Sequence, residues 1–164
     1  MTNFNDETLV GDLLRRRGWS LATAESCTGG LIGDKITNVP GSSDYYLGGV
    51  IAYSNQIKLE QLGVQSATLE QFGAVSQETV IEMARGVRLR FRSDVGLSVS
   101  GVAGPGGGSP EKPVGLTWIG LSTSEFENAW QHLWQGDRLQ VKEQTARQAL
   151  RLLAETLEQG ENYD

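Results

Sequence analysis

The stretch "LATAESCTGGLIGDK", residues 21–35, joins an apolar strand pattern to a helix pattern through a turn of small residues. Ser26 and Cys27 are adjacent candidate nucleophiles in this turn, and Gly29 and Gly30 follow them. The start of a helix leaves backbone N–H groups unpaired, and glycines let a substrate approach the backbone closely. The stretch therefore predicts either a turn that presents a nucleophile or an ordinary N-cap for the helix that follows.

Strand and helix patterns alternate on both sides of this stretch. Strands are predicted over residues 19–25, 48–54, 94–101 and 114–122, and a further strand over 128–135 is predicted to pair with the last of these. Helices are predicted over residues 6–17, from 31 to before Pro40, over 55–63 and 66–73, and from Ser76 to Phe91. An Asp137-x-x-Gln140 capping box opens a last helix. The alternation predicts an α/β fold, a three-layer α/β/α sandwich with a mixed sheet. We find no repeat and no linker, so residues 1–164 are predicted to form a single domain.

Composition excludes several classes of function. Hydrophobic residues make up 38% and charged residues 21% of the chain, as in a soluble globular protein. The net charge of -6 and the lack of a basic stripe argue against nucleic-acid binding. Cys27 is the only cysteine, which excludes an intramolecular disulfide and a Cys-rich metal site. No apolar run approaches the roughly 18 residues that span a membrane, and no secretory signal begins the chain, so we expect a cytoplasmic protein with no membrane partner.

Ser26 is the first candidate nucleophile. At a helix start, the N–H groups of Thr28, Gly29 and Gly30 could hold an oxyanion. A serine nucleophile also needs a base, and the chain offers two candidates.

The first candidate base is Lys58, in "IAYSNQIK", five residues after Tyr53 at the end of a strand. Ligands gather at strand ends in open α/β sheets, and a lysine works as a base when burial lowers its pKa. Tyr53 could relay the proton or hold the serine. Taken alone, however, a lysine is more often a solvated helix residue.

The second candidate base is His132, which could serve Ser26 or Cys27. It lies between Trp130 and Trp134 in a strand pattern, where a lone histidine is more often a packing or surface residue. No neighbouring carboxylate is in place to orient its imidazole ring.

A glycine-rich loop over residues 101–113 follows a clean strand pattern. It lacks both the Walker A and the dinucleotide spacing, and it predicts either a backbone nest for an anion or a flexible surface loop. Arg138, at the start of the last helix, could bind a phosphate or carboxylate.

Five motifs occur in order: "TAESCTGG", "PGSSDYYLGGVIAYSNQIK", "GAVSQET", "SVSGVAGPGGGSPEKPVG" and "GDR". Together they closely resemble the CinA C-terminal domain family, the nicotinamide-nucleotide amidohydrolases, over roughly residues 7–158. The resemblance implies hydrolysis of nicotinamide mononucleotide to nicotinate mononucleotide and ammonia, in pyridine nucleotide recycling. It implies a serine nucleophile with a lysine and a tyrosine, and neither metal nor cofactor.

Residue by residue, the resemblance places the nucleophile on Ser26 and its partners on Tyr53 and Lys58. It makes Ser43, in "GSS", a contributor to the site, and Arg138 matches an arginine before the last helix. The chain departs from the family's frequent pattern at Gln135, where a proline is common, and near Gly106, where the family often lacks glycine. These departures affect the expected substrate affinity more than the chemistry.

Two alternatives stay open at this point. One is a hydrolase that uses Cys27 with His132, and the other is a non-catalytic nucleotide-binding module. We also expect a homo-oligomer, a dimer or larger, in which Trp130 and Trp134 are either a subunit contact or part of the core.

Overall fold

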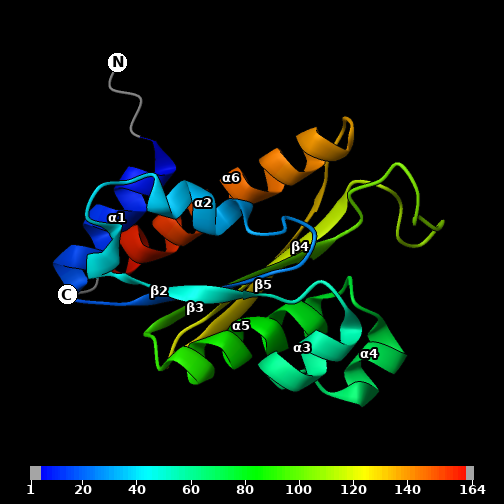
Figure 1. The fold of residues 1–164 in the computed structure, drawn as a ribbon, viewed down its shortest axis with the longest axis horizontal. Coiled ribbons are helices and arrows are strands. Elements are labelled where there is room, and N and C mark those ends of the chain that lie inside the picture. The colour runs from blue at the N-terminus through cyan, green and yellow to red at the C-terminus, as the bar shows by residue number, and fades with distance from the viewer. Residues whose placement is uncertain (1–4, 162–164) are drawn as a thin grey trace.

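A five-stranded mixed sheet runs through the middle of the computed structural model, which describes residues 5–161 (Figure 1). The strands are β1 (Leu21–Glu25), β2 (Tyr46–Ile51), β3 (Val95–Gly101), β4 (Leu116–Ser122) and β5 (Glu127–Leu133), in the order β2-β1-β3-β4-β5. β2, β1 and β3 are parallel, whereas β4 is antiparallel to β3 and β5 is antiparallel to β4. The predicted mixed sheet is confirmed. The pairing of residues 128–135 required only the last strand to be antiparallel to its neighbour, but β4 is already antiparallel to β3.

Helices cover both faces of this sheet. They are α1 (Asp6–Arg17), α2 (Leu31–Thr37), α3 (Asn55–Leu62), α4 (Ser66–Phe72), α5 (Gln77–Phe91) and α6 (Arg138–Glu161), with a short 3-10 helix η1 (Ser42–Asp44). Figure 1 shows α1, α2 and α6 on one face and α3, α4 and α5 on the other. Each interface buries its own apolar cluster, one that includes Leu97 and Leu150 and one that includes Met83 and Val87. This arrangement is the predicted three-layer α/β/α sandwich.

Two helix starts form as their capping residues predict. The Gln140 N–H donates to the Asp137 carboxylate at 2.9 Å, and the Asp137 N–H donates to the Gln140 side chain at 2.8 Å. This reciprocal pair is the capping box of α6. The Ser76 hydroxyl accepts the N–H of Thr79 at 3.2 Å and so caps α5.

The second strand differs from the prediction of residues 48–54, because β2 ends at Ile51. The Ala52 N–H still bonds to the Glu25 carbonyl at 2.8 Å, but Ser54 turns away and accepts the N–H of Ile57 as the N-cap of α3. Tyr53 therefore lies just beyond the sheet, at the carboxyl end of β2 and next to that of β1. No helix within residues 5–161 is long and apolar enough to cross a membrane.

Glycines let α5 lie unusually close to the sheet. A Cβ atom built on Gly96 in β3 would overlap the carbonyl oxygen of Ala84 in α5. We expect Gly96→Ala to lower the free energy of unfolding by about 1–3 kcal/mol, because helix and strand must move apart to admit the methyl group. Urea denaturation measures this change. Gly106→Ala is the matched control, since a Cβ there meets nothing within 4 Å, and an equal loss in both variants would contradict the close-packing argument.

Candidate active site

A cavity of about 320 Å³ opens at the carboxyl ends of β1, β2 and β3. It is lined by Ser26, Cys27, Tyr53, Asn55, Lys58, Ala74, Val75, Ser100, Gly101, Val102, Ala103, Gly104, Gly106, Gly107 and Arg138. The parallel strands bring these segments together, because their carboxyl ends meet at one edge of the sheet. Its size is at the lower end of the range for small-molecule sites.

Lys58 and Ser26 make direct contact at the base of this cavity. The Lys58 Nζ lies 3.2 Å from the Ser26 Oγ, and it donates to the carbonyl oxygens of Ala52 at 2.9 Å and of Tyr53 at 3.4 Å. The Lys58 side chain is 1% exposed, so it is not the solvated helix residue that lysine usually is. A neutral amine has two N–H donors and one lone pair. It can therefore satisfy both carbonyls and still accept the serine proton.

Burial also favours the neutral form of that amine. Desolvation lowers the pKa of Lys58 below its ordinary value of 10.5. A thiolate at Cys27 would oppose this shift, but burial raises the pKa of the Cys27 thiol to about 12, so near neutral pH the thiol carries no charge. Lys58 is thus a buried amine whose hydrogen-bond partners are uncharged, as a general base requires.

The alternative hydrolase built on Cys27 and His132 is wrong. His132 lies in β5, which is separated from β1 by β3 and β4, so the two residues are about 14 Å apart across the sheet. Its ring stacks on Trp134 with centroids 4.9 Å apart, and burial lowers its pKa. Cys27 therefore has no imidazole base, and its raised pKa disfavours the thiolate that would have to attack.

Ser26 lies further from the helix start than expected. α2 begins at Leu31, as predicted, with Gly30 as its N-cap, so Ser26 neither caps the helix nor lies in its first turn. The Gly29 N–H donates to the Ser26 carbonyl at 3.1 Å, which removes it from the expected oxyanion donors. The backbone N–H groups of Thr28 and Gly30 have no acceptor within residues 5–161. Of the three expected donors, these two are unpaired, but none of the three residues is among those that line the cavity.

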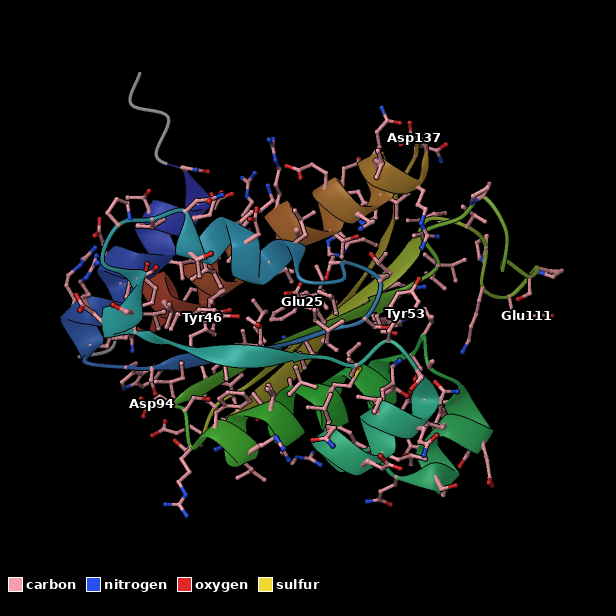
Figure 2. All side chains as sticks on the ribbon, viewed as in Figure 1. Glu25, Tyr46, Tyr53, Asp94, Glu111 and Asp137 are labelled. Atoms are coloured by element: carbon pink, nitrogen blue, oxygen red, sulfur yellow. The ribbon has the colours of Figure 1, made fainter. Side chains whose placement is uncertain are left out.

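Tyr53 makes a different contact from the one expected of it. Its hydroxyl accepts from the Nη2 of Arg138 at 2.9 Å, and it bonds to neither Lys58 nor Ser26. The lysine reaches the tyrosine only at the backbone carbonyl. Tyr53 is 60% exposed and lies at the mouth of the cavity, at the opposite end of the sheet from Asp94 (Figure 2). In this arrangement the proton path from Ser26 to Lys58 is direct.

Ser43 is not brought to the cavity. It lies in η1, which precedes β2, whereas the cavity lies beyond the carboxyl end of that strand. β1 and β2 are parallel, Ser43 precedes β2, and Ser26 follows β1. Within one chain, the length of a strand therefore separates Ser43 from Ser26. The assignment of Ser43 to the site is therefore corrected for the single chain.

The glycine-rich loop contributes its first half to the cavity. Gly104 and Gly107 have φ of 82° and 85°, which glycine adopts readily, and the Arg138 Nη1 donates to the Gly104 carbonyl at 2.7 Å. The second half is anchored elsewhere, because Lys112 donates to the Phe72 carbonyl. The loop is thus tied at both halves rather than free on the surface.

The sequence analysis gave no role to four of the lining residues, Asn55, Ala74, Val75 and Ser100. Ala74 and Val75 lie in the motif "GAVSQET" just before α5, and the fold brings them to β3, where the Ser100 hydroxyl donates to the Ala74 carbonyl. It also gave no role to Glu25, although an acidic residue at the end of an apolar strand is an unusual position.

A second cavity of about 370 Å³ lies at the opposite ends of the strands, by the starts of β1 and β3. Its lining includes Trp19, Phe126 and Leu157, together with Arg17. Its described lining includes no serine, cysteine, histidine or lysine, so it offers no counterpart of the Ser26–Lys58 pair.

Solved structures closely match this fold. A competence-damaged protein (CinA) superfamily protein from Klebsiella pneumoniae matches with a TM-score of 0.91 and 33% identity, covering 94% of this chain and 96% of that one. A competence/damage inducible protein from Agrobacterium tumefaciens matches with a TM-score of 0.85 and 37% identity, covering 96% and 98%.

The sequence comparisons agree with the structural ones. A CinA-like protein of Kosmotoga olearia is 49% identical over 144 residues, which are 88% of this chain and 35% of that protein. The chain spans about a third of the length of the curated relatives it matches. The model of the CinA C-terminal domain family matches residues 4–157. The chain belongs to the CinA C-terminal domain family.

Proposed function

We propose that this domain hydrolyses the amide of nicotinamide mononucleotide through an acyl-enzyme on Ser26. The observation that carries the proposal is the contact of 3.2 Å between the Ser26 Oγ and the buried Nζ of Lys58. A nucleophile within hydrogen-bond reach of a desolvated base is the arrangement that acyl transfer needs. The choice of substrate rests on the motifs shared with nicotinamide-nucleotide amidohydrolases.

Acylation begins when the neutral Lys58 takes the hydroxyl proton of Ser26. The Oγ then bonds to the amide carbon of the substrate, and its carbonyl oxygen becomes an oxyanion. The unpaired N–H groups of Thr28 and Gly30, in the turn that follows Ser26, would donate to this oxyanion. The C–N bond breaks as the protonated Lys58 returns its proton to the leaving nitrogen, and ammonia departs.

Deacylation repeats these steps with water. Lys58, neutral again, accepts a proton from water while the water oxygen bonds to the ester carbon. The bond to the Ser26 Oγ breaks, the serine regains a proton from Lys58, and nicotinate mononucleotide forms as the acid, which loses its proton to water and leaves as the carboxylate. The buried base therefore acts in both halves of the cycle.

Arg138 is the proposed site for the phosphate of the nucleotide. It is the first residue of α6, where the positive end of the helix dipole disfavours a cation. Its guanidinium is nevertheless held at the cavity mouth by the Gly104 carbonyl and the Tyr53 hydroxyl. A bound phosphate would offset the unfavourable charge, and Tyr53 would keep the guanidinium oriented.

Ammonia release from nicotinamide mononucleotide by the purified domain tests the proposal, with metal chelator present throughout. We expect turnover with this nucleotide and much less with nicotinamide riboside, which lacks the phosphate. Saturable nucleotide binding without ammonia release would contradict an amidase and would favour the non-catalytic binding module.

Arg138→Met should raise the KM for the mononucleotide by about 10–100-fold, because a charge-assisted hydrogen bond contributes about 1.5–3 kcal/mol. The substitution keeps the length of the side chain and removes its charge, while the Ser26–Lys58 contact stays intact, so kcat should change far less. Steady-state kinetics with the mononucleotide and the riboside measure this effect. An equal loss for both substrates would show that Arg138 does not bind the phosphate.

A further inference from the structure

Glu25 is a buried carboxylate immediately before the proposed nucleophile. It ends β1, its side chain is 3% exposed, and it lies between α2 and the sheet (Figure 2). A buried carboxylate is costly unless hydrogen bonds replace its hydration. Its partners therefore indicate what the residue is for.

Three donors from the following segment converge on this carboxylate. Oε1 accepts from the Thr28 hydroxyl at 2.6 Å and from the Ile32 N–H at 2.8 Å, and Oε2 accepts from the Gly33 N–H at 3.1 Å. All three are uncharged donors, and Glu25 forms no ion pair within residues 5–161. One side chain thus closes the whole turn from the end of β1 to the first turn of α2.

The backbone around Glu25 is fixed as well. Its carbonyl accepts the N–H of Ala52, the residue whose own carbonyl binds the Lys58 amine. The Ser26 N–H donates to the Val99 carbonyl at 3.1 Å. The nucleophile and its base are therefore held by the same short network, with Glu25 in its middle.

We propose that Glu25 is a positioning residue that holds the Ser26 hydroxyl in line with Lys58. This inference rests on the proposed function, because it takes Ser26 as the nucleophile. A displacement of about 1 Å at a reacting atom can cost about 10²-fold in rate. Without the three bonds, the turn can shift relative to β1 while Lys58 stays in α3.

The effect of Glu25 is geometric rather than electrostatic. The hydrogen bonds of its carboxylate go to Thr28, Ile32 and Gly33 and not to Lys58, and burial is the main cause of the lowered pKa of that lysine. Removal of the Glu25 charge should therefore leave the pH midpoint of the reaction in place. This separates positioning from tuning of the base.

Glu25→Gln tests the inference, because it replaces one acceptor oxygen with an NH₂ group that faces another donor. We expect kcat for ammonia release to fall about 10–100-fold, with KM changed less than about 3-fold and the pH midpoint unmoved. Glu25→Asp should recover little, since its carboxylate falls one methylene short. A kcat within about 2-fold of wild type, or a displaced pH midpoint, would overturn the positioning role.

Ile36→Ala is the matched control for stability. It removes a fully buried side chain from the same helix, yet it leaves every bond of Glu25 in place. We expect a lower thermal midpoint with kcat unchanged. If kcat falls as much as in Glu25→Gln at a similar loss of midpoint, Glu25 only stabilises the fold. If Glu25→Gln does not fold, Thr28→Val removes one of the three bonds, and an unchanged kcat there would refute the proposal.

Labelling of Ser26 by a fluorophosphonate separates this inference from the choice of substrate. In that reaction the Oγ–P bond forms, fluoride leaves, and Lys58 takes the hydroxyl proton. We expect labelling to slow by the same factor in Glu25→Gln as ammonia release does. If the wild type is labelled but releases no ammonia, nicotinamide mononucleotide is rejected as the substrate. The labelling rates of the wild type and of Glu25→Gln then still test the role of Glu25. No labelling of the wild type would overturn both proposals.

Discussion

Lys58→Met is expected to lower kcat for ammonia release by at least about 10³-fold, near the upper range for general-base catalysis. Methionine fills nearly the same volume but has no lone pair that can accept the Ser26 proton. The substituted chain should stay folded, because the lysine it replaces is a buried amine whose partners within residues 5–161 are a hydroxyl and two carbonyls, all uncharged. Steady-state ammonia release measures the loss.

Lys35→Met is the control for this substitution. It also removes an amine, but the Lys35 amine pairs with Glu143 on the α2–α6 surface and does not line the cavity. Its kcat should stay within about 3-fold of wild type. A folded Lys58→Met variant with near wild-type kcat would show that another group is the base.

The same lysine sets the direction of the pH dependence. Burial lowers its pKa below 10.5, and only the neutral amine accepts a proton, so kcat/KM should rise with pH through this lowered pKa. On the acid side the amine is protonated and activity is lost. A pH–rate profile checks this, and a profile that falls through the alkaline range would contradict Lys58 as the base.

Stability should follow the same titration with a defined sign. Between the lowered pKa of Lys58 in the folded state and about 10.5 in the unfolded state, the unfolded chain binds more protons. The wild type therefore gains stability relative to Lys58→Met as pH rises through this window. Urea denaturation of both proteins across the alkaline range measures the difference, and a difference independent of pH would contradict the lowered pKa.

Ser26→Ala should abolish ammonia release, with a loss of about 10³-fold or more, because no acyl-enzyme can form. Cys27→Ala is the matched comparison at the next residue. The Cys27 side chain is 6% exposed in the main apolar cluster, so its loss costs stability through the cavity left behind. Its kcat should stay within about 3-fold of wild type. The reverse outcome, with turnover kept in Ser26→Ala and lost in Cys27→Ala, would assign the nucleophile to the thiol.

The fold could be predicted from local patterns because each element carries its own signal. The capping box of α6 and the Ser76 cap of α5 formed as their spacing indicated, since these bonds join residues three apart. The boundary of β2 was less predictable. Ser54 fits either a strand or a cap, and the start of α3 decides between them.

Parts of the site depend on contacts that no local pattern encodes. The residues alone made Lys58 a solvated side chain, but it is buried in a helix that packs against α5. The start of α2 at residue 31 was predicted correctly, but the role of Glu25 was not, because its carboxylate accepts from an N–H group seven residues downstream. Tyr53 was expected near the serine, but Arg138 approaches it from a segment 85 residues away.

The expected homo-oligomer stays a prediction, and Ser43 gives it a specific consequence. Within one chain this residue lies at the far edge of the sheet from Ser26. A role for Ser43 in catalysis would therefore require a second subunit. Kinetics of Ser43→Ala combined with measured subunit stoichiometry would test this.

The most direct test of the account is to map the covalent intermediate after rapid acid quenching of the domain during turnover of nicotinamide mononucleotide. We predict an ester of nicotinate mononucleotide on the Ser26 side chain, and its absence in Ser26→Ala together with the loss of ammonia release. An adduct on Cys27, or turnover that continues unchanged in Ser26→Ala, would contradict the Ser26–Lys58 mechanism.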